Sequence, residues 1–345
     1  MRNAASPVVL LSILLATNAG LTNSPPNPAA PEILRSTDAL PFNLVGPLLD
    51  PYGYAETAEG DSLLIDRRAH AVMAVNRART AIRPLLTIGQ EIGKVLEPGV
   101  LSVGANGVFA VADAPGGFDR VQYFSISGTR LGGFYLPRRT GGRLLVGSLV
   151  LNGISSMQFT GKTFLVNLPA SGALISEFDV DGLVTRRFGV PRSTGAERDA
   201  ALHQALNVGL PVIDPTGGFY FVFQSGLPIF RKYDAAGRLL FERHIEGPEL
   251  DIPIGALPTV WPARPDPATN PLVPTLVRAA AVDATGRLYI SLSVPYTYVY
   301  DARGEKVRTL QFSAAGIVAP VTMTFSQRTG RLLVTPGCFE FDVQQ

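Results

Sequence analysis

The sequence predicts an all-β fold built from six copies of one antiparallel unit of four strands. Three features support this prediction: short segments in which apolar and polar residues alternate, glycine-containing turns between them, and recurrence of the whole pattern along 345 residues. Alternation with a period of two places successive side chains on opposite faces of a strand. The 35 glycines and 28 prolines supply the many turns that such a fold requires.

The clearest copy of the unit occupies residues 276–313. Its first strand ends in the turn Asp283-Ala-Thr-Gly286, and its third strand ends in the turn Asp301-Ala-Arg-Gly304. Aspartate at the first position of a turn accepts backbone N–H groups, and glycine at the fourth position takes a positive φ without a Cβ clash. Residues 206–246 repeat both turns. Aspartates that recur once per copy are therefore expected to shape turns and not to perform catalysis.

Four looser copies share the spacing of these two. The glycines of the first turn in each copy are separated by 44 to 69 residues along the chain: Gly60, Gly107, Gly161, Gly217, Gly286 and Gly330. Repeats of this length with four strands each are typical of β-propeller blades. The expected blades are residues 54–92, 99–137, 146–190, 206–246, 276–313 and 318–345.

The last copy ends after its third strand, so its outer strand must come from elsewhere. The segment Ile33–Val45 precedes the first blade and is not used by any other copy. We expect it to supply the missing strand and to close the ring. Pro41 is compatible with this position, because an outermost strand leaves one row of N–H groups unpaired.

The repeat resembles the six-bladed propellers of the NHL-like and TolB-like families. The resemblance is carried by AVDATGRLYIS with VYDARG, and by PVIDPTGGFYFV with KYDAAG. It covers roughly residues 54–345, and its motifs specify a fold and no particular activity. Trp261 is the single tryptophan of the chain, so the repeated tryptophan motifs of other propeller classes are absent.

The N-terminus predicts export. Met1 and Arg2 precede the short apolar stretch Val8–Ala16, and small residues follow before a plausible cleavage site. We expect a signal peptide at residues 1–19, a disordered linker at 20–32 and the propeller at 33–345, with a periplasmic or extracellular location. The formal charge of +2 comes from interspersed residues without a basic run, so nucleic-acid binding gains no support. A monomer is the expected state.

Two connections between blades hold the candidate binding residues. The longest departure from the repeat, residues 246–275, carries Trp261 and Arg264, and a proline-rich loop on a rigid ring can form an ordered binding lid. Packing of Trp261 onto the ring is the alternative of equal weight. Arg138, Arg139 and Arg143 form a cluster in a glycine-rich connection. They could meet an anionic partner, although solvation of the loop explains them as well.

The sequence favours a binding scaffold for a protein or small ligand, at the channel mouth or under the 246–275 loop, over an enzyme. No catalytic residue, metal ligand set or cofactor is predicted. The alternative is a metal-dependent hydrolase or lyase, similar to the calcium-dependent lactonases, with its active site in the central channel. The predicted inner strands carry almost no carboxylates, although Glu56, Glu59 and Asp61 lie near the first blade. The three histidines are far apart in the sequence, and we expect His203 to be exposed and Cys338 to be buried.

Overall fold

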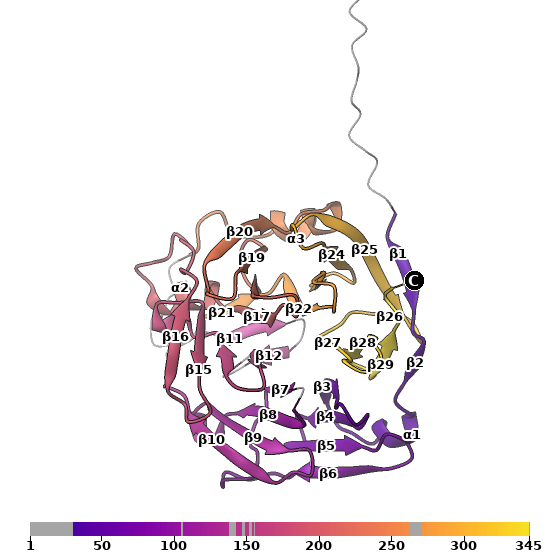
Figure 1. The fold of residues 1–345 in the computed structure, drawn as a ribbon. Helices are drawn as coiled ribbons and strands as arrows, with labels where there is room; N and C mark the ends of the chain where they lie inside the picture. Colours follow the sequence, from indigo (N-terminus) through magenta and orange to yellow (C-terminus); the bar gives the residue numbers. More distant parts are fainter. Residues whose placement is uncertain are drawn as a thin grey trace, which may run out of the picture. The chain divides into compact units, whose positions relative to one another are not determined.

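Six four-stranded antiparallel sheets surround a central axis in the computed structural model, which confirms the predicted six-bladed β-propeller (Figure 1). The structure describes residues 30–104, 106–137, 143–146, 149–151, 154, 156–262, 266 and 271–344. Residues 31–345 form one unit, and the first thirty residues form another. The following description concerns the larger unit.

The first three blades follow each other along the chain, each from its inner to its outer strand. Blade one consists of β3 (Pro51–Glu56), β4 (Ser62–Asp66), β5 (Ala71–Val75) and β6 (Ile82–Leu86). Blade two consists of β7 (Val100–Val103), β8 (Val108–Asp113), β9 (Arg120–Ser125) and β10 (Arg130–Tyr135). Blade three consists of β13 (Met157–Phe159), β14 (Phe164–Val166), β15 (Ile175–Phe178) and β16 (Val184–Phe188).

The other three blades complete the ring. Blade four consists of β17 (Gly209–Ile213), β18 (Phe219–Phe223), β19 (Ile229–Tyr233) and β20 (Leu239–His244). Blade five consists of β22 (Val277–Val282), β23 (Leu288–Leu292), β24 (Thr297–Tyr300) and β25 (Lys306–Ser313). Blade six consists of β27 (Thr322–Phe325), β28 (Leu332–Thr335), β29 (Phe339–Phe341) and β2 (Asp38–Ala39).

Short helices interrupt the connections between blades and, in blades two and three, a connection between two strands of the same blade. They are the α-helices α1 (Phe42–Val45), α2 (Ala200–Leu206) and α3 (Asp251–Gly255), and the 3₁₀ turns Pro115–Gly117, Pro169–Ser171 and Pro248–Leu250. Helix α2 is capped at its N-terminus by Asp199, whose carboxylate accepts the Leu202 N–H. Within the described ranges, no helix is long and apolar enough to cross a membrane.

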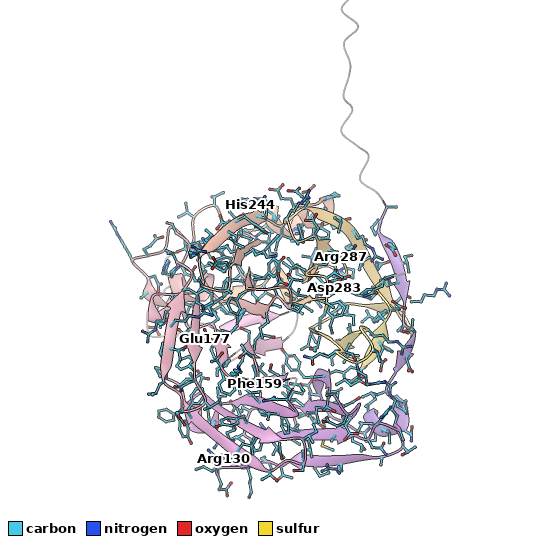
Figure 2. All side chains as sticks on the ribbon, in the orientation of Figure 1. Arg130, Phe159, Glu177, His244, Asp283 and Arg287 are labelled. Carbon is cyan, nitrogen blue, oxygen red and sulfur yellow. The ribbon has the colours of Figure 1, made fainter. Side chains whose placement is uncertain are left out.

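The aspartates of the repeated turns are structural, as the sequence predicts. One carboxylate oxygen of Asp283 accepts the backbone N–H groups of Thr285 and Arg287 and the Thr285 hydroxyl, at 2.7–3.0 Å. Gly286 completes the turn with a φ of 84° and donates its N–H to the Asp283 carbonyl. Figure 2 labels Asp283 and Arg287 beside each other at this turn. The local hydrogen bonds use the carboxylate fully, which explains why this residue recurs.

The N-terminal segment closes the ring, as predicted, with a shorter strand than expected. Strand β2 pairs antiparallel with β29 through Asp38 opposite Glu340 and Ala39 opposite Phe339. The preceding strand β1 (Glu32–Arg35) instead pairs in parallel with β25, the outermost strand of blade five. The segment therefore bridges two adjacent blades. Strand β26 (Ile317–Val318) pairs with the end of β25 on the side away from β1, at Phe312 and Ser313.

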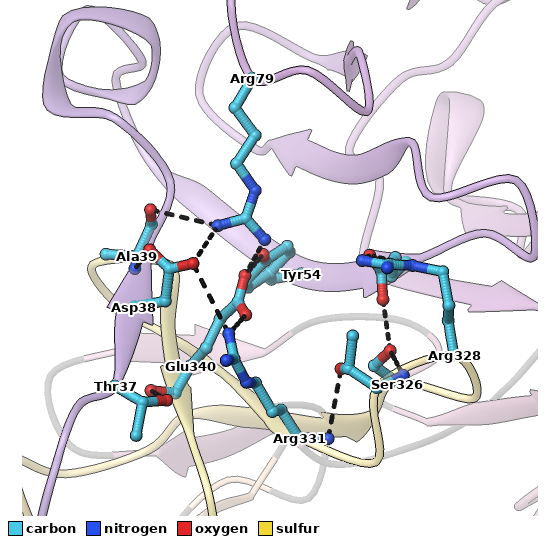
Figure 3. Close-up of polar contacts among 11 residues, drawn as sticks. Thr37, Asp38, Ala39, Tyr54, Arg79, Ser326, Arg328, Arg331 and Glu340 are labelled. Atoms are coloured by element: carbon cyan, nitrogen blue, oxygen red, sulfur yellow. Dashed lines mark hydrogen bonds and ion pairs between the residues drawn. The ribbon is translucent and has the colours of Figure 1, made fainter.

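A buried polar network locks this closure (Figure 3). The Glu340 side chain on β29 is only 2% exposed and accepts the Tyr54 hydroxyl of blade one at 2.8 Å. It also forms ion pairs with Arg79 of blade one and, at 3.1 Å, with Arg331 of blade six. Arg79 reaches Asp38 of β2 at 2.9 Å. One carboxylate thus joins the first blade and the last, and shares Arg79 with the N-terminal strand.

Six apolar clusters form the core, and each lies between two neighbouring blades. Side chains on the two faces of a sheet pack against different neighbours, so the period-two pattern fills the core of both interfaces. Tyr298 and Tyr300 pack between blades four and five, with Tyr296 at the edge of the same cluster. Cys338 is fully buried between blades one and six, and burial raises the pKa of its thiol to about 12.

Candidate functional site at the loop face of the channel

Chain connectivity gives the ring two different faces. Because the four strands of each blade alternate in direction, the glycine turns after the first and third strands all lie on one face, called here the turn face. The long connections between blades start and end on the opposite face, called here the loop face. The connections 136–156 and 245–276 start and end on the loop face. In the sequence, these two connections contain all five predicted binding residues.

Two chambers occupy the central channel, one toward each face. The loop-face chamber has a volume of about 620 Å³, including space open to solvent, and is lined by residues near the starts of all six inner strands. The turn-face chamber, measured in the same way, has about 1220 Å³. The residues that line both chambers mark the boundary between them, and they are Leu101, Gln158, Val212, Ala280, Met323 and Thr324.

Arg278 is the single charged residue among the described residues that line the loop-face chamber. One terminal nitrogen of its guanidinium donates to the Ser293 carbonyl at 2.7 Å. Its Nε is buried and has no acceptor among the described residues. Burial lowers the pKa of this guanidinium, and no neighbouring charge acts against that effect. The chamber therefore holds a cation that no charged group of the described residues compensates.

Two of the six inner strands are irregular, and both irregularities border this chamber. The register of β3 against β4 shifts between Tyr52 and Ala55, and that of β22 against β23 shifts between Val277 and Ala279. Gly53 at the first bulge has a φ of 70° and lines the chamber, as Arg278 does at the second. Bulges interrupt the pairing of a strand and redirect side chains, and they are common beside functional sites.

A small additional sheet joins the two long connections on the loop face. Strand β11 (Arg143–Val146) pairs with β12 (Leu149–Leu151) and, in parallel, with β21 (Leu272–Pro274). We call this three-stranded sheet the cap. Its strands β11 and β21 come from connections that lie two blades apart in the ring. Residues from 146 onward were expected to start blade three, but the blade itself begins at Met157, because β11 and β12 pair within the cap.

Side-chain packing fixes the cap to the ring. Val273 of β21 is 1% exposed and packs with Leu202, Ala205 and Leu206 of α2. Thr275, directly after β21, forms a bridge with Ser225 beside the chamber.

The structure brings together the two segments that the sequence singled out. Trp261 is half-buried and packs against the α2 cluster that holds Val273, so its contacts follow the packing alternative. Arg143 opens β11, and its backbone lies opposite Leu272. Arg138, Arg139 and Arg264 lie outside the described residues.

Sequence reasoning missed Arg278 and Gln224. Gln224 lines the same chamber, is 1% exposed and directs its amide nitrogen to the Arg278 carbonyl at 3.4 Å. A signal for Arg278 was present, because it is a lone charge in the apolar strand VRAAAV. Gln224 carries no such signal, since its position depends on how the loop after β18 folds.

Two of the three acidic residues considered as metal ligands, Glu56 and Asp61, are engaged elsewhere. Glu56 lines the turn-face chamber, but its carboxylate accepts the Ser326 hydroxyl and pairs with Arg328 at 2.5 Å. Asp61 accepts the Arg77 N–H at 2.8 Å. Within the described ranges, no three histidine, cysteine, aspartate or glutamate side chains form a group that could hold a metal ion.

The histidines do not come together. His203, in the last turn of α2, is half-buried, so the expected exposure is wrong. The reason is that the Thr194 hydroxyl, from the loop before the helix, shares a hydrogen bond of 2.7 Å with its ring. His70 accepts the Glu97 N–H at 2.7 Å, and His244 is exposed on the outer strand β20 of blade four.

Comparisons with known proteins agree on the fold. No model of a known protein family matches this sequence, and no protein of curated function matches it. Among solved structures, a streptogramin B lyase is 12% identical with a TM-score of 0.52, and the match covers 88% of this chain and 95% of that one. Virginiamycin B lyase from Staphylococcus aureus is 12% identical with a TM-score of 0.51, covering 85% and 79%.

A third solved structure belongs to a different propeller class. The WD40 β-propeller domain of Doa1 is 11% identical with a TM-score of 0.51, and the match covers 85% of this chain and 78% of that one. Lyases and a WD40 domain thus match this chain about equally well. At such low identity the likeness shows a shared fold, and the activities named for those proteins do not transfer to this chain.

Proposed function

We propose that this protein is an exported scaffold that binds a small ligand in the loop-face chamber, beneath the cap. The observation that carries this proposal is the pairing of β11 with β21, which joins two distant connections on the face where the chamber opens. Ordering two long loops costs conformational entropy, and a binding site is a common reason for a rigid ring to carry them.

Features of the chamber support a ligand of small size. Its lining combines apolar side chains with a few polar groups, among them Ser156, Gln158 and Thr322, which is the usual composition of small-molecule sites. Even with open solvent counted, its volume of about 620 Å³ is too small for a folded domain. The two inner-strand bulges place Gly53 and Arg278 at its wall.

Thermal-shift measurements on the purified protein test this proposal. The compounds are a panel of sugars, amino acids, carboxylic acids and nucleotides. At least one compound is expected to raise the Tm of the wild type. Stabilisation grows with the ratio of ligand concentration to Kd and reaches about 2.7 kcal/mol at a hundredfold excess. Ala280→Phe, which fills the boundary between the chambers, should abolish the shift, whereas Ala302→Phe on an exposed turn should retain it.

Two results would contradict binding in the chamber. In the first, no compound of the panel shifts the Tm of the wild type. In the second, Ala280→Phe folds normally and responds to a compound as the wild type does.

Export is the second part of the proposal and rests on the charged, apolar and small residues of positions 1–19. Expressed in a bacterial host with two membranes, the full chain is expected in the periplasmic fraction or the medium, shortened at its N-terminus. A chain that starts at residue 20 should stay in the cytoplasm. Recovery of the full chain with Met1 intact from the cytoplasmic fraction would contradict export.

A further inference from the structure

Arg278 lies at the bulge of β22. The direction of its side chain therefore does not follow the regular alternation of a strand. Val277 packs between blades four and five, where Ala280 and Val282 also lie. Ala279 and Ala281 pack between blades five and six. In a regular strand Val277 would share a face with Ala279, so the alternation slips by one residue between them.

The slip leaves Arg278 outside both interfaces. The pairing confirms this, because Val277 lies opposite Leu292 and Ala279 opposite Ser291, which leaves no partner for the residue between them. The extra residue of a bulge can aim its side chain independently of the two sheet faces. Here that residue carries the charge that lines the loop-face chamber.

No carboxylate in the described part of the chain neutralises this charge. No ion pair of Arg278 exists among the described residues, and desolvation alone shifts the pKa of its guanidinium. The sequence of residues 138–155, the bulk of one connection, contains three arginines and no acidic residue, so none can come from there. Withdrawing a charge from water without a partner is unfavourable, and an anion that enters the chamber would relieve that cost.

Gln224 adds a second unsatisfied group next to the arginine. Its side chain is 1% exposed, and its amide nitrogen faces the Arg278 carbonyl at 3.4 Å. Its amide oxygen has no donor among the described residues. Buried polar groups without partners are rare in folded proteins, and a missing ligand or water is a usual explanation.

We propose that the loop-face chamber binds the oxyanion group of a small organic anion through the guanidinium of Arg278. The inference rests on the proposed binding function and specifies the chemistry of its ligand. The oxyanion, a carboxylate or a phosphate, takes donors of the guanidinium that the protein leaves free, since Ser293 engages only one terminal nitrogen. A donor on the same ligand would satisfy the Gln224 oxygen.

The test uses acetate, citrate, inorganic phosphate and, as the neutral counterpart of acetate, acetamide. Each is titrated into the purified protein at low ionic strength, and binding is followed by calorimetry and thermal shift. At least one anion is expected to bind saturably and more weakly as salt is added, because salt screens the charge. Acetamide is expected not to bind. A preference for citrate and acetate over phosphate, or the reverse, tells which oxyanion the chamber takes.

Variants of Arg278 separate a binding role from a structural one. Arg278→Met removes the charge and is expected to weaken anion binding about tenfold to a hundredfold, as for loss of a charge-assisted hydrogen bond. Arg278→Lys should retain part of the affinity. In the absence of ligand, Arg278→Met should keep or raise the Tm, because it removes an uncompensated charge. Arg238→Gln, whose side chain is 82% exposed on a turn, is the matched control and should bind as the wild type does.

Three results would overturn the inference: no anion binds, acetamide binds as well as acetate, or Arg278→Met binds anions like the wild type. A lower Tm of ligand-free Arg278→Met would assign the arginine a structural role and would also contradict it. A neutral compound that binds the wild type and is blocked by Ala280→Phe would refute the anion while leaving the proposed binding function intact.

Discussion

Replacing Glu340 by alanine is expected to lower the free energy of unfolding by about 3–5 kcal/mol, the usual cost of removing one partner from a buried ion pair. The change leaves the Tyr54 hydroxyl without its acceptor and two arginines without their shared carboxylate. It also weakens the seam where the last blade meets the first. Urea denaturation followed by circular dichroism measures the loss.

Two control variants define this result. Glu340→Gln keeps the shape of the side chain and one acceptor for Tyr54, so its loss should be smaller. Glu305→Ala removes a glutamate whose side chain is 70% exposed and whose contact with Arg243 is 3.9 Å long. Exposed pairs of this kind contribute about 1 kcal/mol or less. Equal stabilities of Glu340→Ala and Glu305→Ala would show that the network does not hold the ring closed.

Alkaline pH is expected to unfold the protein cooperatively. Burial raises the pKa of Tyr289 to about 12 and raises those of Tyr54, Tyr298 and Tyr300 well above the ordinary value. The native state therefore holds these protons more tightly than the unfolded chain does. Their contribution to stability is complete below pH about 10, where unfolded tyrosine titrates. It is lost as the pH rises above that value, because only the unfolded chain then releases its protons.

The size of this effect follows from the number of groups. Each such tyrosine lowers the free energy of unfolding by about 1.4 kcal/mol per pH unit above pH about 10. Four together give about 5–6 kcal/mol per unit, which exceeds a typical total stability of about 5–15 kcal/mol within one to three units. Tyrosinate absorbance and circular dichroism, recorded during one titration, are expected to change in the same step.

Tyr300→Phe provides the matched variant for the alkaline transition. It keeps the ring that packs 4.8 Å from Phe230 and removes one ionisable hydroxyl, so the stability should fall less steeply with pH. Ionisation of all buried tyrosines near pH 10 with an unchanged circular dichroism spectrum would contradict the expectation. It would mean that the blade interfaces admit charge without unfolding.

The cap shows where prediction from sequence reached its limit. The sequence marks the connection around Trp261 as the longest departure from the repeat and the connection around Arg143 as glycine-rich. Their pairing was not predicted, because β11 and β21 are separated by more than a hundred residues and neither segment has a distinctive pattern. The same limit applies to Arg278. The alternation of apolar and polar residues does not reveal the bulge that sets its position.

Local chemistry explains what the sequence determined by itself: the strands, the aspartate–glycine turns, the six-fold repeat and the closing N-terminal strand. Each of these depends on neighbouring residues, or on a count of repeats that leaves one strand missing. Only the tertiary structure decided that Glu340 joins two blades, that β11 pairs with β21 and that Arg278 is the one charged residue among the described residues that line its chamber. These features arise where distant segments meet, and contacts between distant segments have no local pattern in the sequence.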